Sequence, residues 1–322
     1  MVVNYLCVPI KMSIRTRRCF TFRDTTQIIN EFYKDINTFF QPSSGYTSMT
    51  EDGQSKKTTA VDSSSPYKYS REAILNQKKI KKGSTRWNQF SQTLSEIFPA
   101  CLKEPILDFG CGVGYFVLEG LRRNMDIWGV DMLPGKIERY KRLVEYTKSP
   151  GDWKKRCLVG NGAELPFSTG SFAALSSWYV FEHIPNPGQC IREMVRVTRK
   201  NGVIAIRAQD ARNGWEGHCK IPWVPFLSDR LSRVWIEEFE VSPTLRDGVY
   251  DITQPQIRAI FEELGCKIVR EAAEPRQLIE SHQKLTTEKE VRDTARRIRA
   301  DFRSGKWLPQ PENLYIFAQK MH

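Results

Sequence analysis

Short apolar runs alternate with amphipathic segments along most of the chain from about residue 85 onward. The apolar runs are rich in Ile, Val, Leu and Phe and are bounded by glycines and polar residues, which is typical of buried strands. The segments between them place apolar residues three and four positions apart, which predicts helices. The pattern predicts an α/β fold with a doubly wound, Rossmann-like sheet of seven strands and helices on both faces. Strands and helices alternate up to the fifth strand, which predicts parallel strands there, with ligands at their carboxyl ends.

The pattern assigns each element to a range. The predicted strands are residues 106–109, 127–131, 156–160, 172–179, 202–207, 266–270 and 313–319. The predicted helices are residues 85–98, 115–123, 134–146, 187–199 and 254–264, and residues 275–303 are also expected to be helical. Trp87, Phe90 and Leu94 share one face of the first helix, which we expect to cover one flank of the sheet.

Two segments lie outside this alternation. Residues 1–66 are an N-terminal extension, in which 24–40 has apolar residues at helical spacing and 41–66 is polar, as in a linker or a disordered loop. Residues 67–322 form the main domain. Within it, residues 211–250 are rich in Trp, Pro, Phe and Arg and predict a partly helical lid inserted after the fifth strand.

Composition limits the class of protein. The 322 residues are 40% hydrophobic, enough for one substantial core, and no apolar run is long enough to span a bilayer. The N-terminus puts its apolar part before its basic part, the wrong order for a secretory signal, although residues 11–23 could mimic a transit peptide. The eight cysteines are scattered, which predicts reduced thiols and a cytoplasmic protein. The four histidines do not cluster with them, so no metal site is expected.

The formal net charge of +12 is concentrated near the N-terminus. Residues 1–86 contain 15 Lys and Arg against 7 Asp and Glu, a surplus of 8, which leaves +4 for residues 87–322. A basic N-terminal region could bind RNA, an anionic membrane or an acidic partner, but a solvated tail or helix face is the simpler and preferred account of the charge. The rest of the chain is nearly neutral.

The first strand ends in Asp108-Phe-Gly-Cys-Gly-Val-Gly-Tyr115, with Gly110, Gly112 and Gly114 at alternate positions. Glycines give the backbone a tight turn and remove Cβ atoms that would hold a ligand away, and the helix that follows offers unpaired N–H groups. The dinucleotide fingerprint requires a glycine where Tyr115 stands, so G-x-G-x-x-G is not satisfied. The loop therefore predicts a nucleotide-cofactor site of another type.

The run D-x-G-x-G-x-G resembles motif I of the class I S-adenosylmethionine (SAM) methyltransferases. Three further segments resemble later motifs of that family: residues 160–167, the sequence Glu182-His183-Ile184-Pro185 after the fourth strand, and residues 192–202. The resemblance covers residues 105–208, and more loosely 254–319, and is to the small-molecule branch similar to ubiquinone-biosynthesis enzymes. Asn161 and Ala173 depart from the family, which usually has Asp at both positions.

The resemblance implies SAM as cofactor and S-adenosylhomocysteine (SAH) as product. Asp131 stands where a carboxylate accepts hydrogen bonds from the ribose, although it could simply cap the next helix. Met132 could pack on the adenine, and Asn161 could accept from its amino group. The residues expected at the cofactor are Asp108, Gly110, Cys111, Gly112, Gly114, Asp131, Met132, Asn161, Gly162, Ala163 and Trp178.

Methyl transfer is an in-line displacement at an activated carbon, so positioning does most of the work. An amine acceptor needs no strong base, whereas a hydroxyl needs a proton acceptor, for which His is well suited. His183 and His218 are the two candidates, each with a plain structural role as the alternative. The residues expected to line the acceptor pocket are Tyr179, Asp210, Arg212, Trp215 and Trp223, whose aromatic members could equally be packing residues.

These observations predict a SAM-dependent methyltransferase acting on an O or N atom of a polar small molecule, with glycosidic and anionic acceptors included. Two alternatives stay open: an RNA or protein methyltransferase that docks through the basic N-terminal region, and a SAM-binding regulatory protein without catalysis. Motifs for methylation of exocyclic nitrogens or pyrimidine carbons are absent from the sequence, which favours the small-molecule acceptor. The sequence sets neither the acceptor nor the oligomeric state.

Overall fold

The computed structural model describes residues 70–272, 285–306 and 313–322. The predicted N-terminal helix (24–40), the linker (41–66) and the first part of the helical stretch predicted for 275–303 lie wholly or largely outside these ranges. No helix among the described residues is long and apolar enough to cross a membrane.

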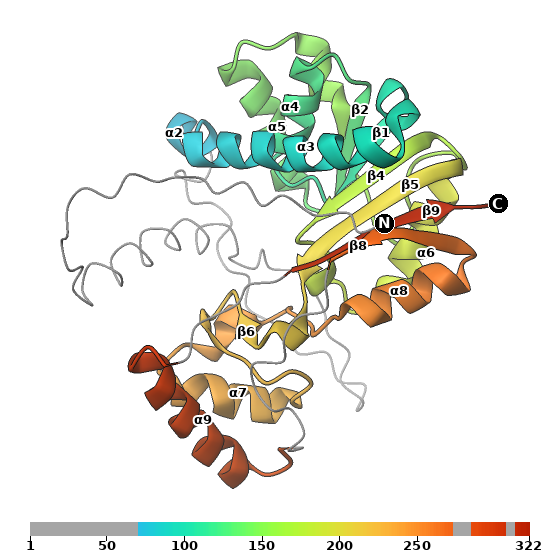
Figure 1. Cartoon of the computed structure of the whole chain (residues 1–322). Helices are drawn as coiled ribbons and strands as arrows, with labels where there is room; N and C mark the ends of the chain where they lie inside the picture. Colours follow the sequence, from blue (N-terminus) through green and yellow to red (C-terminus); the bar gives the residue numbers. More distant parts are fainter. Residues whose placement is uncertain (1–69, 273–284, 307–312) are drawn as a thin grey trace, which may run out of the picture. The chain divides into compact units, whose positions relative to one another are not determined.

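The seven predicted strands form one sheet in the order β3-β2-β1-β4-β5-β9-β8 (Figure 1). Their bounds are β1 (Ile106–Phe109), β2 (Ile127–Asp131), β3 (Cys157–Val159), β4 (Phe172–Trp178), β5 (Thr198–Gln209), β8 (Cys266–Glu271) and β9 (Asn313–Lys320). The first five are parallel, which confirms the doubly wound arrangement. The last two strands differ, because β9 lies between β5 and β8 and runs antiparallel to both, so the sheet as a whole is mixed.

The strand order reverses between β1 and β4, which are neighbours in the sheet although β2 and β3 separate them in the chain. In doubly wound sheets, the carboxyl ends of the strands open into a crevice at such a switch point, and ligands bind there. The glycine run follows β1 directly, so the fold places it at this crevice.

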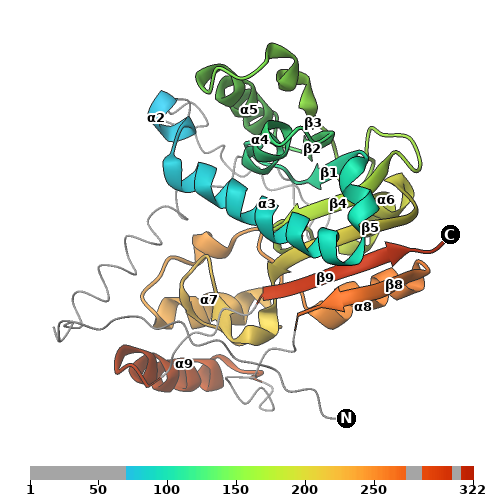
Figure 2. The ribbon, with the colours of Figure 1, turned by 45° about the horizontal axis from the view of Figure 1, so that its top comes forward.

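Helices cover both faces of the sheet (Figures 1 and 2). One apolar cluster joins α3 (Gln77–Ile97), α4 (Tyr115–Arg122) and α5 (Pro134–Tyr146) to strand residues such as Ile106. A second joins α6 (Pro187–Val197) and α8 (Gln254–Glu263) to residues such as Leu107. Because successive side chains of a strand point to opposite faces, Ile106 and Leu107 belong to different clusters, and both are fully buried.

The helix predicted for residues 85–98 is longer than expected and begins at Gln77, after the short helix α2 (Arg71–Ile74). The side chain of Asn76 accepts a hydrogen bond from the N–H of Lys79 and caps the helix, so the basic stretch that follows is helical as well. Its side chains Trp87, Phe90 and Leu94 are buried against the sheet side, as predicted.

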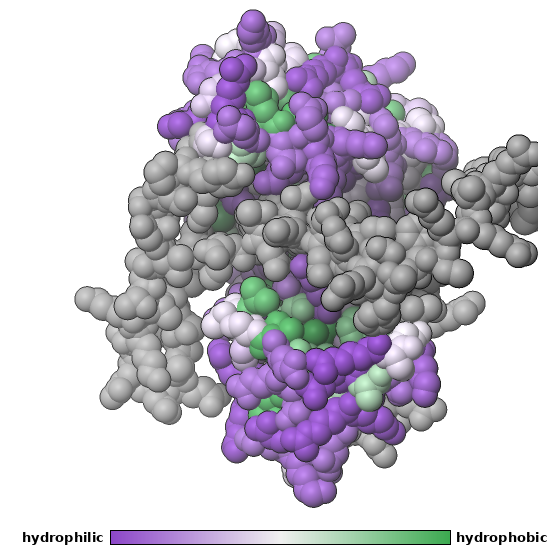
Figure 3. Space-filling view, turned by 90° about the vertical axis from the view of Figure 1, so that its left-hand side faces the viewer, coloured by the Kyte–Doolittle hydropathy of each residue, from purple (hydrophilic) through white to green (hydrophobic). Residues whose placement is uncertain are grey.

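The predicted lid contains a two-stranded hairpin of β6 (Trp215–Glu216) and β7 (Ile221–Pro222), followed by α7 (Asp229–Glu238). The helix α9 (Glu288–Arg303) packs on α7 in a separate apolar cluster, and Arg292 and Arg296 pair with Glu238. The sequence predicted a helix here but not that it joins the lid. In the view of Figure 3, an apolar patch lies among polar side chains on the lid side of the molecule.

Helix α3 approaches α4 closely at Gly83, where an added Cβ would lie 2.6 Å from the backbone oxygen of Tyr115. An alanine in a helix is normally more stable than a glycine by about 1 kcal/mol. At Gly83 the added methyl group would clash with backbone, so the substitution should destabilise the protein instead. We expect Gly83→Ala to lower the free energy of unfolding by about 1–3 kcal/mol in urea denaturation. In Gly188→Ala, where the added Cβ would have only an ordinary contact at 3.6 Å, the same change should be neutral or stabilising. Equal effects at the two positions would contradict this packing.

Candidate cofactor and acceptor site

The loop after β1 uses each of its three glycines differently. Gly110, Gly112 and Gly114 all have positive φ angles, of 73°, 57° and 72°. A Cβ at Gly110 would lie 2.4 Å from Val180, and one at Gly114 would lie 2.3 Å from Tyr140, whereas one at Gly112 would meet nothing within 4 Å. The outer glycines are therefore required by packing and conformation, while the middle one leaves backbone facing open space, as a ligand-binding loop requires.

Asp131 holds this loop from the end of β2. Its Oδ2 accepts a hydrogen bond of 2.8 Å from the N–H of Gly112, and its Oδ1 accepts one of 3.0 Å from the N–H of Leu133, at the start of α5. Asp131 therefore orders the turn that leads into α5, but it does not cap that helix, whose N-cap residue is Leu133 and has no side-chain cap hydrogen bond. Each carboxylate oxygen has a further lone pair, so these bonds leave capacity for ribose hydroxyls. Met132, next to it, is 47% exposed.

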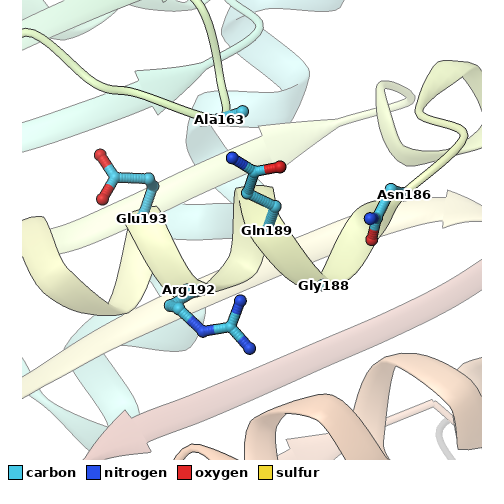
Figure 4. Close-up of a pocket in the computed structure, with 6 residues that line it drawn as sticks. All are labelled: Ala163, Asn186, Gly188, Gln189, Arg192 and Glu193. Carbon is cyan, nitrogen blue, oxygen red and sulfur yellow. The ribbon is translucent and has the colours of Figure 1, made fainter.

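The loop after β3 packs against the end of β1. The side-chain oxygen of Asn161 accepts a 3.0 Å hydrogen bond from the N–H of Ala163, so it already shapes its own turn. A Cβ at Gly162 would lie 2.6 Å from Phe109, which explains the glycine. Ala163 borders a pocket of about 460 Å³ that α6 lines on its other side with polar residues, among them Gln189 and Arg192 (Figure 4).

The end of β4 carries Trp178 and Tyr179. Trp178 is buried between Phe116 and Tyr315, with ring centroids at 6.2 and 5.8 Å, so the structure places it in the core between α4 and β9 rather than on the glycine loop. Cys111, also expected at the cofactor, is 9% exposed, and an added Cβ at Gly129 of β2 would lie 2.8 Å from its sulfur. Both predicted contacts with the cofactor remain hypotheses.

Tyr179 has a φ of 58°, and its N–H donates to the carbonyl of Arg207 at 2.7 Å. Aromatic residues with positive φ are rare, and such strain concentrates at functional sites. The Tyr179 hydroxyl accepts a 3.1 Å hydrogen bond from Asn313 at the start of β9. Tyr179 therefore lies at the crevice in a fixed orientation.

Arg86, on α3, was missed by the sequence reasoning. Its guanidinium carbon lies 5.9 Å from the ring centroid of Trp178 and 5.3 Å from that of Tyr179. Burial lowers the pKa of Arg86, and the nearby Tyr179 and Asp108 oppose the shift. Within the described ranges it forms no hydrogen bond or ion pair. One feature of the sequence could have indicated it. Arg86 stands four residues before Phe90, on the apolar face of the helix, where a charged residue is unusual unless it has a partner or a function.

Two buried carboxyl groups lie behind the crevice. Asp108 is 4% exposed and accepts a 2.8 Å hydrogen bond from Ser176 on β4, and burial raises its pKa to about 7, against the effects of Ser176 and Arg86. Glu182 is also 4% exposed, and its Oε2 has no hydrogen-bond partner among the described residues. Burial raises its pKa to about 7 as well, while its own backbone and His218 act in the opposite direction.

His183 and His218 come together although 35 positions separate them. His183 lies in a short 3-10 helix (Phe181–His183) after β4, and His218 lies in the turn of the lid hairpin. Their rings meet edge to face with centroids 5.1 Å apart. The Nδ1 of His218 lies 2.8 Å from Glu216 Oε1, and the Nδ1 of His183 lies 3.2 Å from the carbonyl oxygen of Gly248. The sequence reasoning missed Glu216, two residues before a candidate catalytic His.

Asp210 and Arg212 support the lid instead of facing a pocket. The Asp210 carboxylate is 1% exposed and accepts hydrogen bonds from Arg212, including one of 2.7 Å from its guanidinium, and one of 3.0 Å from the N–H of Gln254. It therefore ties the end of β5 to the start of α8. The expectation that these two residues contact the acceptor has no support in this arrangement.

Trp215 and Trp223 are inside the lid. Trp223 is 1% exposed, donates its ring N–H to Asp251 at 3.1 Å and stacks under Arg246 at 4.1 Å. Trp215 is 6% exposed and contacts the ring of Phe302 on α9. Of the two roles considered for these residues, lid packing is the one that the geometry supports.

The raised pKa of Glu182 has a consequence for stability. An acid whose pKa is higher in the folded state binds its proton more tightly there. The stabilisation is therefore complete below pH 4.5, the ordinary pKa of a Glu, and is lost as the pH rises to about 7, the pKa of Glu182 in the folded protein. Glu182→Gln should remove this loss, and its free energy of unfolding should decline less between pH 5 and 7, by about 3 kcal/mol at most. Urea denaturation across this pH range measures the difference. Glu138→Gln, at an exposed position of α5, is the control, and parallel curves for wild type and Glu182→Gln would contradict the prediction.

Residues 107–206 match the family model described as a methyltransferase domain. An uncharacterized methyltransferase of Mycobacterium sp. (strain JLS) is 35% identical over 101 residues, which are 31% of this chain and 37% of the relative. A malonyl-[acyl-carrier protein] O-methyltransferase of Halorhodospira halophila is 24% identical over 189 residues, 55% of this chain and 62% of that protein. The chain thus spans about a third to two thirds of the length of these relatives.

Among solved structures, a putative sarcosine dimethylglycine methyltransferase from Galdieria sulphuraria has a TM-score of 0.49 at 15% identity, covering 75% of this chain and 88% of that one. The site itself has the motif order that the sequence predicted, from the glycine loop through Asp131 to the segment after β4. Residues 107–206 of this chain therefore match a methyltransferase domain, and they lie at the centre of the seven-stranded sheet.

Proposed function

We propose that this protein transfers the methyl group of SAM to an O or N atom of a polar small molecule. The observation that carries the proposal is the pairing of the open backbone at Gly112 with the Asp131 carboxylate, at the switch point of a methyltransferase-type sheet. SAM supplies a methyl group that is already activated by its sulfonium charge. The protein must then bind it, hold the acceptor in line and keep water out.

The residues present fit SAM along its length. Asp131 offers free lone pairs for the ribose hydroxyls, and the exposed Met132 offers an apolar surface for the adenine beside it. Arg86, held over Trp178 and Tyr179, offers a guanidinium for the carboxylate of the methionine part. Asp131 ends β2, and Arg86 lies beside Trp178 and Tyr179 where β4 ends, so the two proposed roles belong to different strands of the sheet.

The acceptor side of the site is polar. His183, Glu182 and His218 gather where β4 ends and the lid begins, and Glu216 lies behind them. Such a wall suits an acceptor with hydrogen-bonding groups better than a purely apolar one. The O-methyltransferase among the relatives also supports an oxygen atom as the methyl acceptor. A cytoplasmic location also remains a proposal, supported by the six free cysteines of the described residues.

Binding of SAM and SAH by titration calorimetry tests the cofactor site. Asp131→Ala removes the loop anchor and the ribose acceptor together, and Gly112→Val fills the open space, so each should weaken binding by about tenfold or more. Glu138→Ala removes an exposed carboxylate from α5 and should leave affinity unchanged. Wild-type affinity in Asp131→Ala and Gly112→Val would refute the proposed site.

The role of Arg86 is tested with two ligands. SAM carries the methionine carboxylate, whereas 5′-methylthioadenosine has the same nucleoside and a thioether but no carboxylate. Arg86→Gln should therefore lose about 1.5–3 kcal/mol of SAM affinity, the usual value of a hydrogen bond to a charged group, and almost none for methylthioadenosine. Equal losses for both ligands would show that Arg86 acts on the structure of the site and not on the carboxylate.

A further inference from the structure

The lid hairpin fixes the orientation of His218. Glu216 Oε1 accepts hydrogen bonds from both the backbone N–H and the Nδ1 of His218, each of 2.8 Å. The turn is held further by the N–H of Lys220, which donates to the carbonyl of Glu216 at 2.7 Å. Because an ionised carboxylate can only accept, the proton lies on Nδ1 of His218, and Nε2 is the basic nitrogen of the neutral ring.

Glu216 is held in its charged form. It is 2% exposed, and its second oxygen accepts a 3.0 Å bond from Arg246, which also pairs with Asp251. Burial opposes ionisation, but the hydrogen bond and charge of His218 and the charge of Arg246 outweigh it, so the pKa of Glu216 is lowered. A buried carboxylate thus lies behind the imidazole, while the His218 side chain itself is 10% exposed.

The pair lies at the edge of the proposed methyl-transfer site. The His218 ring contacts His183, which directly follows the buried Glu182. The lid is joined to this segment by the N–H of Tyr250, which donates to the carbonyl of Glu182 at 2.8 Å, and by the bond between His183 and Gly248. The hairpin therefore brings a base to the end of β4, where an acceptor would meet the donor.

His183 is less suited to take a proton. A carbonyl oxygen can only accept, so Nδ1 of His183 donates to the neutral carbonyl of Gly248, whereas Nδ1 of His218 faces a carboxylate. Burial and the neighbouring His218 lower the pKa of His183 to about 4, which makes it a weak base near neutral pH.

On the basis of the proposed methyltransferase function, we infer that His218, positioned by Glu216, is the general base for a hydroxyl acceptor. The acceptor oxygen forms a bond to the methyl carbon as the bond from that carbon to sulfur breaks, and the sulfonium becomes the neutral thioether of SAH. The hydroxyl proton moves to Nε2 of His218, and Glu216 stabilises the imidazolium that results. The proton then passes to solvent.

This arrangement distinguishes a hydroxyl from an amine. A neutral amine attacks through its own lone pair and can release its proton after transfer, so a buried carboxylate behind an imidazole would add little. A hydroxyl oxygen becomes positively charged unless its proton leaves during the attack. Glu216 is paired with Arg246 through one oxygen, and its other oxygen faces Nδ1 of His218, where it would stabilise the positive charge that only the second case creates.

The first test does not depend on turnover. The full chain has four histidines, so nitrogen-15 spectra of histidine-labelled protein can be assigned by the signal lost in His218→Asn. We expect neutral His218 to carry its proton on Nδ1 in wild type and in Glu216→Gln, whose amide oxygen can still accept. In Glu216→Leu the proton should move mainly to Nε2. A wild-type ring protonated on Nε2 would overturn the proposal.

The second test uses SAM labelled with carbon-13 in its methyl group, together with a protein-free and nucleic-acid-free extract of small molecules. Matched probes, glucose with glucosamine and catechol with 2-aminophenol, are run in parallel. The carbon shift of the transferred methyl separates O-methyl from N-methyl products. We expect O-methyl products, a rate lowered about 100-fold or more in His218→Asn and about 10–100-fold in Glu216→Gln, and unchanged SAM affinity in both. His322→Asn, at the exposed C-terminus, is the control.

The outcomes separate the two proposals. Products methylated only on nitrogen or carbon, or O-methylation that survives in His218→Asn, would overturn the base while leaving a methyltransferase. An absence of any transferred methyl in every arm, with SAM bound, would overturn the hydroxyl acceptor and leave only the cofactor site. Failure of wild type to bind SAM would refute the proposed function itself.

Discussion

The left-handed turn after β1 is the constraint on which the rest of the site depends. Because Gly110 has no Cβ, Val180 can pack where that atom would be, and Val180 directly precedes the short helix that carries Glu182 and His183. The turn is closed on its other side by the bond from Gly112 to Asp131. A single backbone conformation thus sets the distance between the cofactor loop and the acceptor segment, and a side chain at Gly110 would separate them.

Buried charge is the second physical feature of the site. Asp108 and Glu182 are each 4% exposed, and Glu216 is 2% exposed, but burial does not act on them alike. Burial raises the pKa of Asp108 and Glu182 to about 7, whereas the hydrogen bond and charge of His218 and the charge of Arg246 lower the pKa of Glu216. The geometry agrees, because both oxygens of Glu216 have cationic or N–H partners while Oε2 of Glu182 has no hydrogen-bond partner among the described residues.

The sequence predicted what local patterns determine. The seven strands and the glycine turn follow from periodicity and glycine spacing, and both are present. The antiparallel direction of β9 and the packing of α9 on α7 depend on contacts between distant segments, which no local pattern encodes. Glu216 was missed for a related reason, because it looks like an ordinary surface charge until tertiary structure places the ring of His218 beside it. Arg86 stands on the apolar face of its helix, but only tertiary structure shows the aromatic rings beside it.

The family match ends just before the lid, which contains the residues proposed to act on the acceptor. The matched residues end at 206, four positions before Asp210 and ten before Glu216. The matched part contains the glycine loop, Asp131 and His183, the residues of the proposed donor site and its border, whereas Glu216, His218 and Arg246 lie in the lid beyond it. One sheet can serve many acceptors when the residues that contact the acceptor lie on an inserted segment, and this lid has its own apolar core. The proposed use of SAM therefore rests on the matched domain, and the proposed hydroxyl acceptor rests on the carboxylate, imidazole and guanidinium that this lid assembles.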